Sequence, residues 1–129
     1  MPNTRKSCLK VAFLAVSAAP GVAAIDMSGG SNESPELSRY CIQPPSFARR
    51  FLEPYARPIA KAIGIPTIMA GRVIDPEDAE GILQAGSADF VAVCRALVAD
   101  AYWTRKAFGE IKTPIRKCIS CNVCFERLT

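Results

Sequence analysis

Three short apolar runs in the middle of the chain constrain its fold more strongly than any other feature. They occupy residues 22–27, 65–70 and 88–93 of the 129-residue sequence, and segments with helical patterns follow them. Strands that are apolar throughout are buried on both faces, and strands that alternate with helices are typical of parallel β/α units. The sequence therefore predicts an α/β fold with a parallel sheet.

The clearest helix start follows the second apolar run, at the tripeptide Asp75-Pro76-Glu77. An N-cap aspartate, a proline at the first helical position and acidic residues in the first turn all favour a helix at this point. We expect this helix to end at Gly86. The residues predicted to face inward are Ala79, Ile82 and Leu83.

Three other segments complete the predicted organisation. Prolines keep 32–46 in a long loop, and they leave 47–63 as a kinked helix whose most regular part is 58–63. Residues 97–108 are predicted to be mostly helical. A closed eight-stranded barrel takes about 250 residues. The three β/α units therefore form either a small open sheet or part of a barrel.

The first twenty residues allow two interpretations. Basic residues precede an apolar run, 11–19, which ends in small residues as a cleaved signal peptide would. The same run is typical of the end of a core helix that stops at Pro20 and Gly21. It is too short to span a bilayer, and we expect no membrane association.

Composition excludes several classes of function. Half of the residues are apolar, as in an ordinary globular domain, and the net charge of +4 comes from basic residues interleaved with acidic ones. No basic face for nucleic acid is expected. The sequence contains no histidine, which removes the commonest general base and the commonest nitrogen ligand of metals.

Cys118, Cys121 and Cys124 form the densest group of reactive side chains. Their spacing is too tight for ordinary disulfides and is typical of metal or iron–sulfur ligands, which indicates a reduced, cytoplasmic protein. Closed zinc and iron–sulfur sites normally use four protein ligands, so one ligand is missing from this group.

An arginine follows each of the last two apolar runs, in the pairs Gly71-Arg72 and Cys94-Arg95. The carboxyl ends of neighbouring parallel strands are where α/β proteins bind ligands, and barrels commonly hold phosphate there. Arginine pairs with phosphate through two parallel hydrogen bonds. The alternative is that both arginines are surface residues at strand ends. The occurrence of two such pairs favours a phosphate site.

An ordered set of residues between Ile65 and Cys124 resembles a known family. It comprises Ile65-Pro66-Thr67-Ile68, Ala70-Gly71-Arg72-Val73-Ile74-Asp75-Pro76, Ala79-Glu80, Leu83, Gly86, Ala88-Asp89, Arg95-Ala96-Leu97, Ala99-Asp100, Lys106, Gly109 and Cys118-Ile119-Ser120-Cys121-Asn122. This pattern resembles the old yellow enzyme superfamily, and within it the NADH:flavin oxidoreductase branch that includes 2,4-dienoyl-CoA reductase, 2-enoate reductase and trimethylamine dehydrogenase.

The resemblance implies an FMN-binding TIM (β/α)8 barrel, of which residues 21–113 supply about the last three β/α units. Residues 1–20 match nothing in the family. In the family, residues at the positions of Gly71, Arg72, Cys94 and Arg95 hold the FMN phosphate, although glycine or alanine usually stands where this chain has Cys94. The resemblance assigns no catalytic residue within the chain.

The resemblance also implies that 114–129 begin an iron–sulfur segment, in which Cys118, Cys121 and Cys124 bind a [4Fe-4S] cluster. The family's fourth cysteine lies further along than Thr129, so we expect a fragment that is inactive by itself. In the full-length relative, NAD(P)H would be the electron donor, and the substrate would be an enone, an enoyl compound or an amine. The isolated chain could associate through exposed barrel edges.

Two other hypotheses stay open from the residues alone. The first is a zinc- or metal-binding module without catalytic activity, in which three thiolates and a solvent or partner ligand surround the metal. The second is a small secreted protein stabilised by disulfides, which requires cleavage of the N-terminal run.

Overall fold

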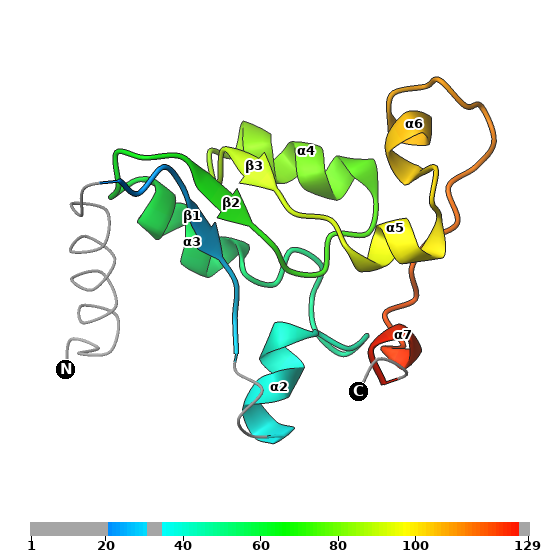
Figure 1. Cartoon of the computed structure of the whole chain (residues 1–129), viewed down its shortest axis with the longest axis horizontal. Helices are drawn as coiled ribbons and strands as arrows, with labels where there is room; N and C mark the ends of the chain where they lie inside the picture. The colour runs from blue at the N-terminus through cyan, green and yellow to red at the C-terminus, as the bar shows by residue number, and fades with distance from the viewer. Residues whose placement is uncertain (1–20, 31–34, 127–129) are drawn as a thin grey trace.

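The computed structural model describes residues 21–30 and 35–126 (Figure 1). The two interpretations of the N-terminal run concern residues outside these ranges. Within them, strands β1 (Ile25–Met27), β2 (Thr67–Met69) and β3 (Phe90–Val91) form a parallel sheet in the order β1-β2-β3. The predicted α/β organisation with parallel strands is therefore confirmed, with strands shorter than the apolar runs.

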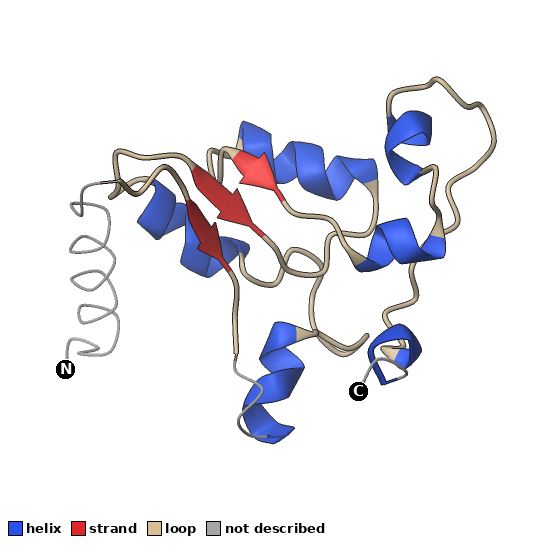
Figure 2. Ribbon diagram, in the orientation of Figure 1, coloured by secondary structure: helices blue, strands red, loops and turns tan. Residues whose placement is uncertain are grey.

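One face of the sheet packs into the hydrophobic core. Ile25 is level with Thr67 and Met27 is level with Met69, so residues in these two rows point to the same side. All four are buried, and Met69 is completely inaccessible. They meet helices α3 (Glu53–Ala60) and α4 (Pro76–Gln84), which lie behind the strands in Figure 2. Apolar side chains of both helices belong to the same core cluster, among them Ala56, Ile59 and Ile82.

The opposite face of the sheet is open. Asp26, Ile68 and Phe90 stand side by side in the register of the three strands. Asp26 is exposed, Ile68 is half-buried and Phe90 is 58% exposed. The prediction that the strands are buried on both faces is therefore wrong, because α3 and α4 both pack on the other side and no described helix covers this face.

Helix α4 follows the predicted start. Asp75 is its N-cap and forms a capping box with Asp78, whose carboxylate accepts the backbone N–H of Asp75 at 3.1 Å. Ile82 is completely buried, Ala79 is half-buried, and Leu83 is 41% exposed. The inward orientation predicted for Leu83 is wrong, because the helix face that contains Asp78 and Ile82 is the one turned to the sheet.

Helix α3 lies within the segment 47–63 that was predicted to be a kinked helix, and it includes both Pro54 and Pro58. Pro54 lies in the first turn, where the missing N–H costs no helical hydrogen bond. Pro58 lies inside the helix and removes one such bond. Burial of Ala56 and Ile59 against the core stabilises the helix despite this loss. The expectation that 58–63 would be the regular part is wrong.

Two more segments differ from the predictions. The predicted loop contains helix α2 (Pro35–Cys41), which has an acidic residue in its first turn and a basic one in its last turn. The predicted helix at 97–108 is two short helices, α5 (Arg95–Ala99) and α6 (Trp103–Ala107), since Asp100 between them has extended backbone. Helix α7 (Val123–Glu126) ends the described chain. No helix in the described ranges combines the length and apolar character needed to cross a membrane.

Replacement of Ile82 by alanine tests the position of the core. Because Ile82 is completely buried between α4 and the sheet, Ile82→Ala should lower the free energy of unfolding by about 2–4 kcal/mol. The neighbouring Leu83→Ala removes a side chain that is 41% exposed and should cost less than about 1 kcal/mol. Urea denaturation followed by circular dichroism measures both, and equal losses would contradict the assigned helix face.

Candidate functional site

The four residues predicted to hold phosphate lie around one cavity. The parallel register places the carboxyl ends of β2 and β3 side by side, and the chain leaves them through Gly71-Arg72 and Cys94-Arg95. The cavity at this edge has a volume of about 100 Å³, which is room for several water molecules or a small anion. It is lined by Cys41, Gln43, Ala70, Gly71, Arg72, Val73, Ala92, Cys94 and Arg95.

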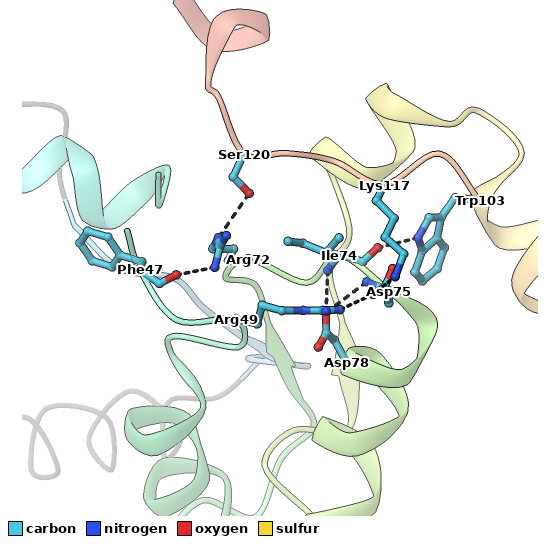
Figure 3. Close-up of polar contacts among 9 residues, drawn as sticks. All are labelled: Phe47, Arg49, Arg72, Ile74, Asp75, Asp78, Trp103, Lys117 and Ser120. Atoms are coloured by element: carbon cyan, nitrogen blue, oxygen red, sulfur yellow. Dashed lines mark hydrogen bonds and ion pairs between the residues drawn. The ribbon is translucent and has the colours of Figure 1, made fainter. Parts of the chain in front are cut away.

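The turn after β2 depends on glycine. Gly71 has a φ of +129°, and a Cβ at this position would approach Leu52 Cγ at 3.1 Å. Arg72 follows with a φ of +52°. The Arg72 side chain then extends between two loops (Figure 3). Its Nε donates to Ser120 Oγ at 3.3 Å and its Nη1 donates to the carbonyl oxygen of Phe47.

Arg95, at the first position of α5, is held in a similar way. Its Nη1 donates to the carbonyl oxygen of Gln43 at 2.8 Å and to Asn122 Oδ1 at 2.5 Å. The Asn122 amide in turn donates to the carbonyl oxygen of Ile42 at 2.9 Å. Cys94, directly before Arg95, is exposed and also lines the cavity. Ser120 and Asn122 belong to the matched cysteine pattern, but neither was assigned a role from the sequence.

The charges of Arg72 and Arg95 are not neutralised within the described part of the chain, because all of their acceptors there are uncharged oxygens. Other arginines differ. Arg49 pairs with Asp75 at 2.6 Å and also with Asp78, and Arg57 pairs with Glu53 at 2.8 Å. Two half-buried, uncompensated guanidinium groups beside one cavity make this edge of the sheet suited to an anion.

The cysteine motif contacts Arg72 and Arg95 through Ser120 and Asn122, but its three thiols are not drawn together. Cys118 is half-buried and its sulfur accepts the backbone N–H of Ser120 at 3.4 Å, whereas Cys121 is exposed. In the described residues, no three histidine, cysteine, aspartate or glutamate side chains are placed to hold a metal ion. As donors the thiols fit an iron–sulfur cluster, and hydrogen bonds to sulfur are usual there. They would have to converge to bind one.

A second cavity brings together thiols that the sequence did not connect. It has a volume of about 210 Å³ and a mostly apolar lining that includes Cys41, Cys94 and Cys124. No sequence signal links these three residues, since helix α2, the N-cap of helix α5 and helix α7 contribute one each. All the cysteines in the described ranges are free thiols.

Asp100 holds the segment before the cysteine motif in place through hydrogen bonds. Its carboxylate accepts hydrogen bonds from Lys106 Nζ at 2.6 Å and from the backbone N–H groups of Arg116 and Tyr102 at 2.9 and 3.0 Å. The Lys106 contact, followed by these backbone bonds, lowers the pKa of Asp100 from 3.8 to about 2. Lys106 also donates to the carbonyl oxygen of Pro114 at 3.0 Å.

Asp75 makes a second attachment. Lys117 Nζ lies 2.9 Å from Asp75 Oδ2, the oxygen that also pairs with Arg49 (Figure 3). Burial by itself would raise the pKa of Asp75, but the hydrogen bonds from Lys117 and Arg49 outweigh it and lower that pKa below its usual range. The helix cap of α4 thus also positions the start of the cysteine motif over the strand ends.

No protein-family model matches the chain. Individual relatives do. An NADH oxidase from Thermoanaerobacter brockii is 42% identical over 104 residues, which are 80% of this chain and 15% of the relative. A metal reductase from Desulforamulus reducens is 34% identical over 122 residues, or 95% of this chain and 18% of the relative. A cinnamate reductase from Clostridium sporogenes is 36% identical over 93 residues, which are 70% of this chain and 14% of the relative.

These relatives support a relationship of the chain to the NADH:flavin oxidoreductase family. The chain spans less than a fifth of the length of each of these relatives, all of which are oxidoreductases by name. A solved structure, the 6-hydroxypseudooxynicotine amine oxidase from Pseudomonas geniculata, matches 66% of this chain and 13% of its own chain with a TM-score of 0.60 and 24% identity. This likeness concerns the fold alone.

The pH dependence of stability tests the role of Asp100. Its folded pKa of about 2 lies below the ordinary value of 3.8, so its charged form stabilises the fold above pH 3.8 and this contribution is lost as the pH falls toward 2. Asp100→Asn should therefore be less stable than the wild type at neutral pH, and the difference should shrink through this window. Denaturation midpoints measure it, and a difference that does not change with pH would contradict the assignment.

Proposed function

We propose that this chain is part of an FMN-dependent NAD(P)H:flavin oxidoreductase that also carries a [4Fe-4S] cluster. Residues 21–113 would form about the last three β/α units of its barrel, and 114–129 the start of its cluster segment. The relatives support this proposal through their names, which include reductases of cinnamate and bilirubin and a dehydrogenase of dimethylamine. The substrate would accordingly be a small enone, enoyl compound or amine.

The observation that carries the proposal is the pair of uncompensated arginines at the ends of β2 and β3. Both line the cavity of about 100 Å³ and both leave Nη2 without an acceptor in the described residues. Arg72 and Arg95 would bind the dianionic phosphate of FMN, and the turn at Gly71 would let the backbone approach it. When bound, FMN supplies hydride transfer between NAD(P)H and the substrate.

The open face of the sheet supports the barrel origin. In a β/α barrel, helices cover the outside of the strands and the inner face packs against side chains from the other strands. Here α3 and α4 cover one face, while Ile68 and Phe90 on the other face have no described helix over them. Apolar side chains and unpaired strand edges of this kind favour association with further barrel strands or with other chains.

The thiols support the second cofactor. Cys118, Cys121 and Cys124 would supply three cluster ligands, and the cluster would relay single electrons to or from the flavin. The Ser120 N–H already donates to the Cys118 sulfur. A reducing, cytoplasmic location would accord with the spacing of Cys118, Cys121 and Cys124, which is typical of metal ligands and too tight for ordinary disulfides.

A comparison of FMN with riboflavin isolates the phosphate contact. Wild-type protein should quench FMN fluorescence at lower concentration than riboflavin fluorescence, and Arg72→Ala or Arg95→Ala should reduce this preference by about tenfold or more. Binding will be weak and lost during gel filtration, because the contacts to the flavin ring belong to other strands. Equilibrium titration is therefore the measurement.

Arg105→Ala is the matched control for these variants, because Arg105 pairs with Glu110 on the surface and does not line the cavity. It should leave the preference for FMN unchanged. Equal binding of FMN and riboflavin by the wild type would reject the phosphate site.

Anaerobic reconstitution with iron and sulfide tests the cluster. The wild type should gain broad visible absorption, and Cys121→Ser should lose most of it because an exposed ligand is removed. Cys41→Ser is the control, since Cys41 lies outside the motif and should not affect the absorption. Colourless binding of zinc with no visible band after iron treatment would favour the metal-binding module instead.

A further inference from the structure

Both candidate phosphate arginines contact residues that lie inside the cysteine motif. Arg72 Nε donates to Ser120 Oγ at 3.3 Å, and Arg95 Nη1 donates to Asn122 Oδ1 at 2.5 Å. Ser120 lies between Cys118 and Cys121, and Asn122 follows Cys121 directly. The loop that spaces the thiols therefore also determines where the two guanidinium groups are held.

Ser120 connects the two candidate sites through one residue. Its side-chain oxygen accepts from Arg72 while its backbone N–H donates to the Cys118 sulfur at 3.4 Å. Ser120 is buried, with 1% of its surface exposed, so both contacts lie away from solvent. A change in the position of Cys118 is thus transmitted to the acceptor of Arg72 over a single residue.

Asn122 performs the corresponding role for Arg95. Its amide accepts from Arg95 through Oδ1 and donates through Nδ2 to the Ile42 carbonyl oxygen. Arg95 Nη1 also donates to the carbonyl oxygen of Gln43, so two acceptors hold this nitrogen. Asn122 therefore fixes the guanidinium against the segment that follows α2.

The loop conformation itself is a costly one. Ser120 has a φ of 57° and Asn122 has a φ of 64°. Both values lie in the left-handed region, which residues other than glycine adopt rarely. Such conformations persist only where surrounding contacts hold them. The hydrogen bonds to Arg72 and Arg95 are contacts of this kind, so arginine positions and loop conformation stabilise each other.

Uncharged acceptors are suited to holding an arginine that must bind an anion. A carboxylate would hold an arginine but would also neutralise it and repel phosphate, whereas a hydroxyl or an amide oxygen fixes the guanidinium and leaves its charge in place. Pre-organised donors bind a ligand more tightly because less conformational freedom is lost on binding.

We propose that Ser120 and Asn122 are positioning residues for the phosphate site, through which the conformation of the cysteine motif sets the affinity for a phosphate-bearing ligand. This inference rests on the proposed phosphate site at Arg72 and Arg95. The ligand class is a phosphomonoester dianion, of which FMN is the probe, and riboflavin is the matched compound that lacks the phosphate.

Glycine substitutions remove the contacts while permitting the left-handed backbone. In the full chain, Ser120→Gly and Asn122→Gly should each reduce the preference for FMN over riboflavin by about two- to tenfold, with riboflavin affinity unchanged. Ile119→Gly is the control: Ile119 is 74% exposed in the same loop, so its replacement loosens the loop without removing a contact to either arginine. It should keep the wild-type preference.

Asn122→Asp separates positioning from mere structural support. Aspartate tolerates the left-handed region and keeps an oxygen acceptor for Arg95, and it loses only the Nδ2 donor to the Ile42 carbonyl oxygen. Thermal denaturation should show that the fold is retained. The aspartate charge should neutralise Arg95 and abolish most of the FMN preference. This variant decides the question if a glycine variant fails to fold.

The outcomes are distinguishable. A wild type that prefers FMN, together with Ser120→Gly, Asn122→Gly and Asn122→Asp variants that keep this preference, would overturn the positioning role and leave the phosphate site intact. A wild type with no preference would overturn the phosphate site, and the positioning role with it.

Discussion

The parallel register of β2 with β3 is the constraint on which the candidate site depends. Because Met69 is level with Val91, both strands end at the same edge of the sheet, and the two turns that follow bring Arg72 and Arg95 to one cavity. Burial fixes this register, since a shift of one residue would move Met69 from the core to the open face. Core packing and site geometry are thus consequences of the same strand pairing.

The arginines that stabilise the fold pair with acidic residues, whereas those at the candidate site do not. Arg49 pairs with acidic residues that cap α4, and Arg57 pairs with the buried Glu53 of α3. Those pairs hold elements of the fold together. Arg72 and Arg95 are hydrogen-bonded to uncharged oxygens alone in the described residues, so their charge is available to a ligand.

Local sequence signals predicted the parts of the fold that local interactions determine. The capping sequence at Asp75 is confirmed, and the parallel strands follow from their apolar runs. The errors arise where tertiary packing decides. Pro58 stays within a helix because neighbouring residues are buried, and Phe90 is exposed because helices cover only one face of the sheet. Periodicity alone does not contain this information.

The candidate site shows the same division. Arg72 and Arg95 were found because each follows a predicted strand, and the structure places them together. Gln43, Ser120 and Asn122 were not found, since nothing in their sequence indicates that residues from two distant segments meet at these arginines. Hydrogen bonds between loops depend on how the loops pack, and loop packing has no periodic signal.

The position of the cysteine motif follows from attachments at both of its ends. Asp100 and Asp75 hold the segment before Cys118 through Arg116 and Lys117, and the arginines hold the loop after it. The loop is therefore fixed by charged groups of the sheet edge rather than by its own thiols, which are not gathered around a common centre in the described residues. Ser120 contacts both the Cys118 sulfur and Arg72, so a ligand that displaced Cys118 would act directly on the acceptor of Arg72, and we expect thiol ligation and anion binding to be coupled.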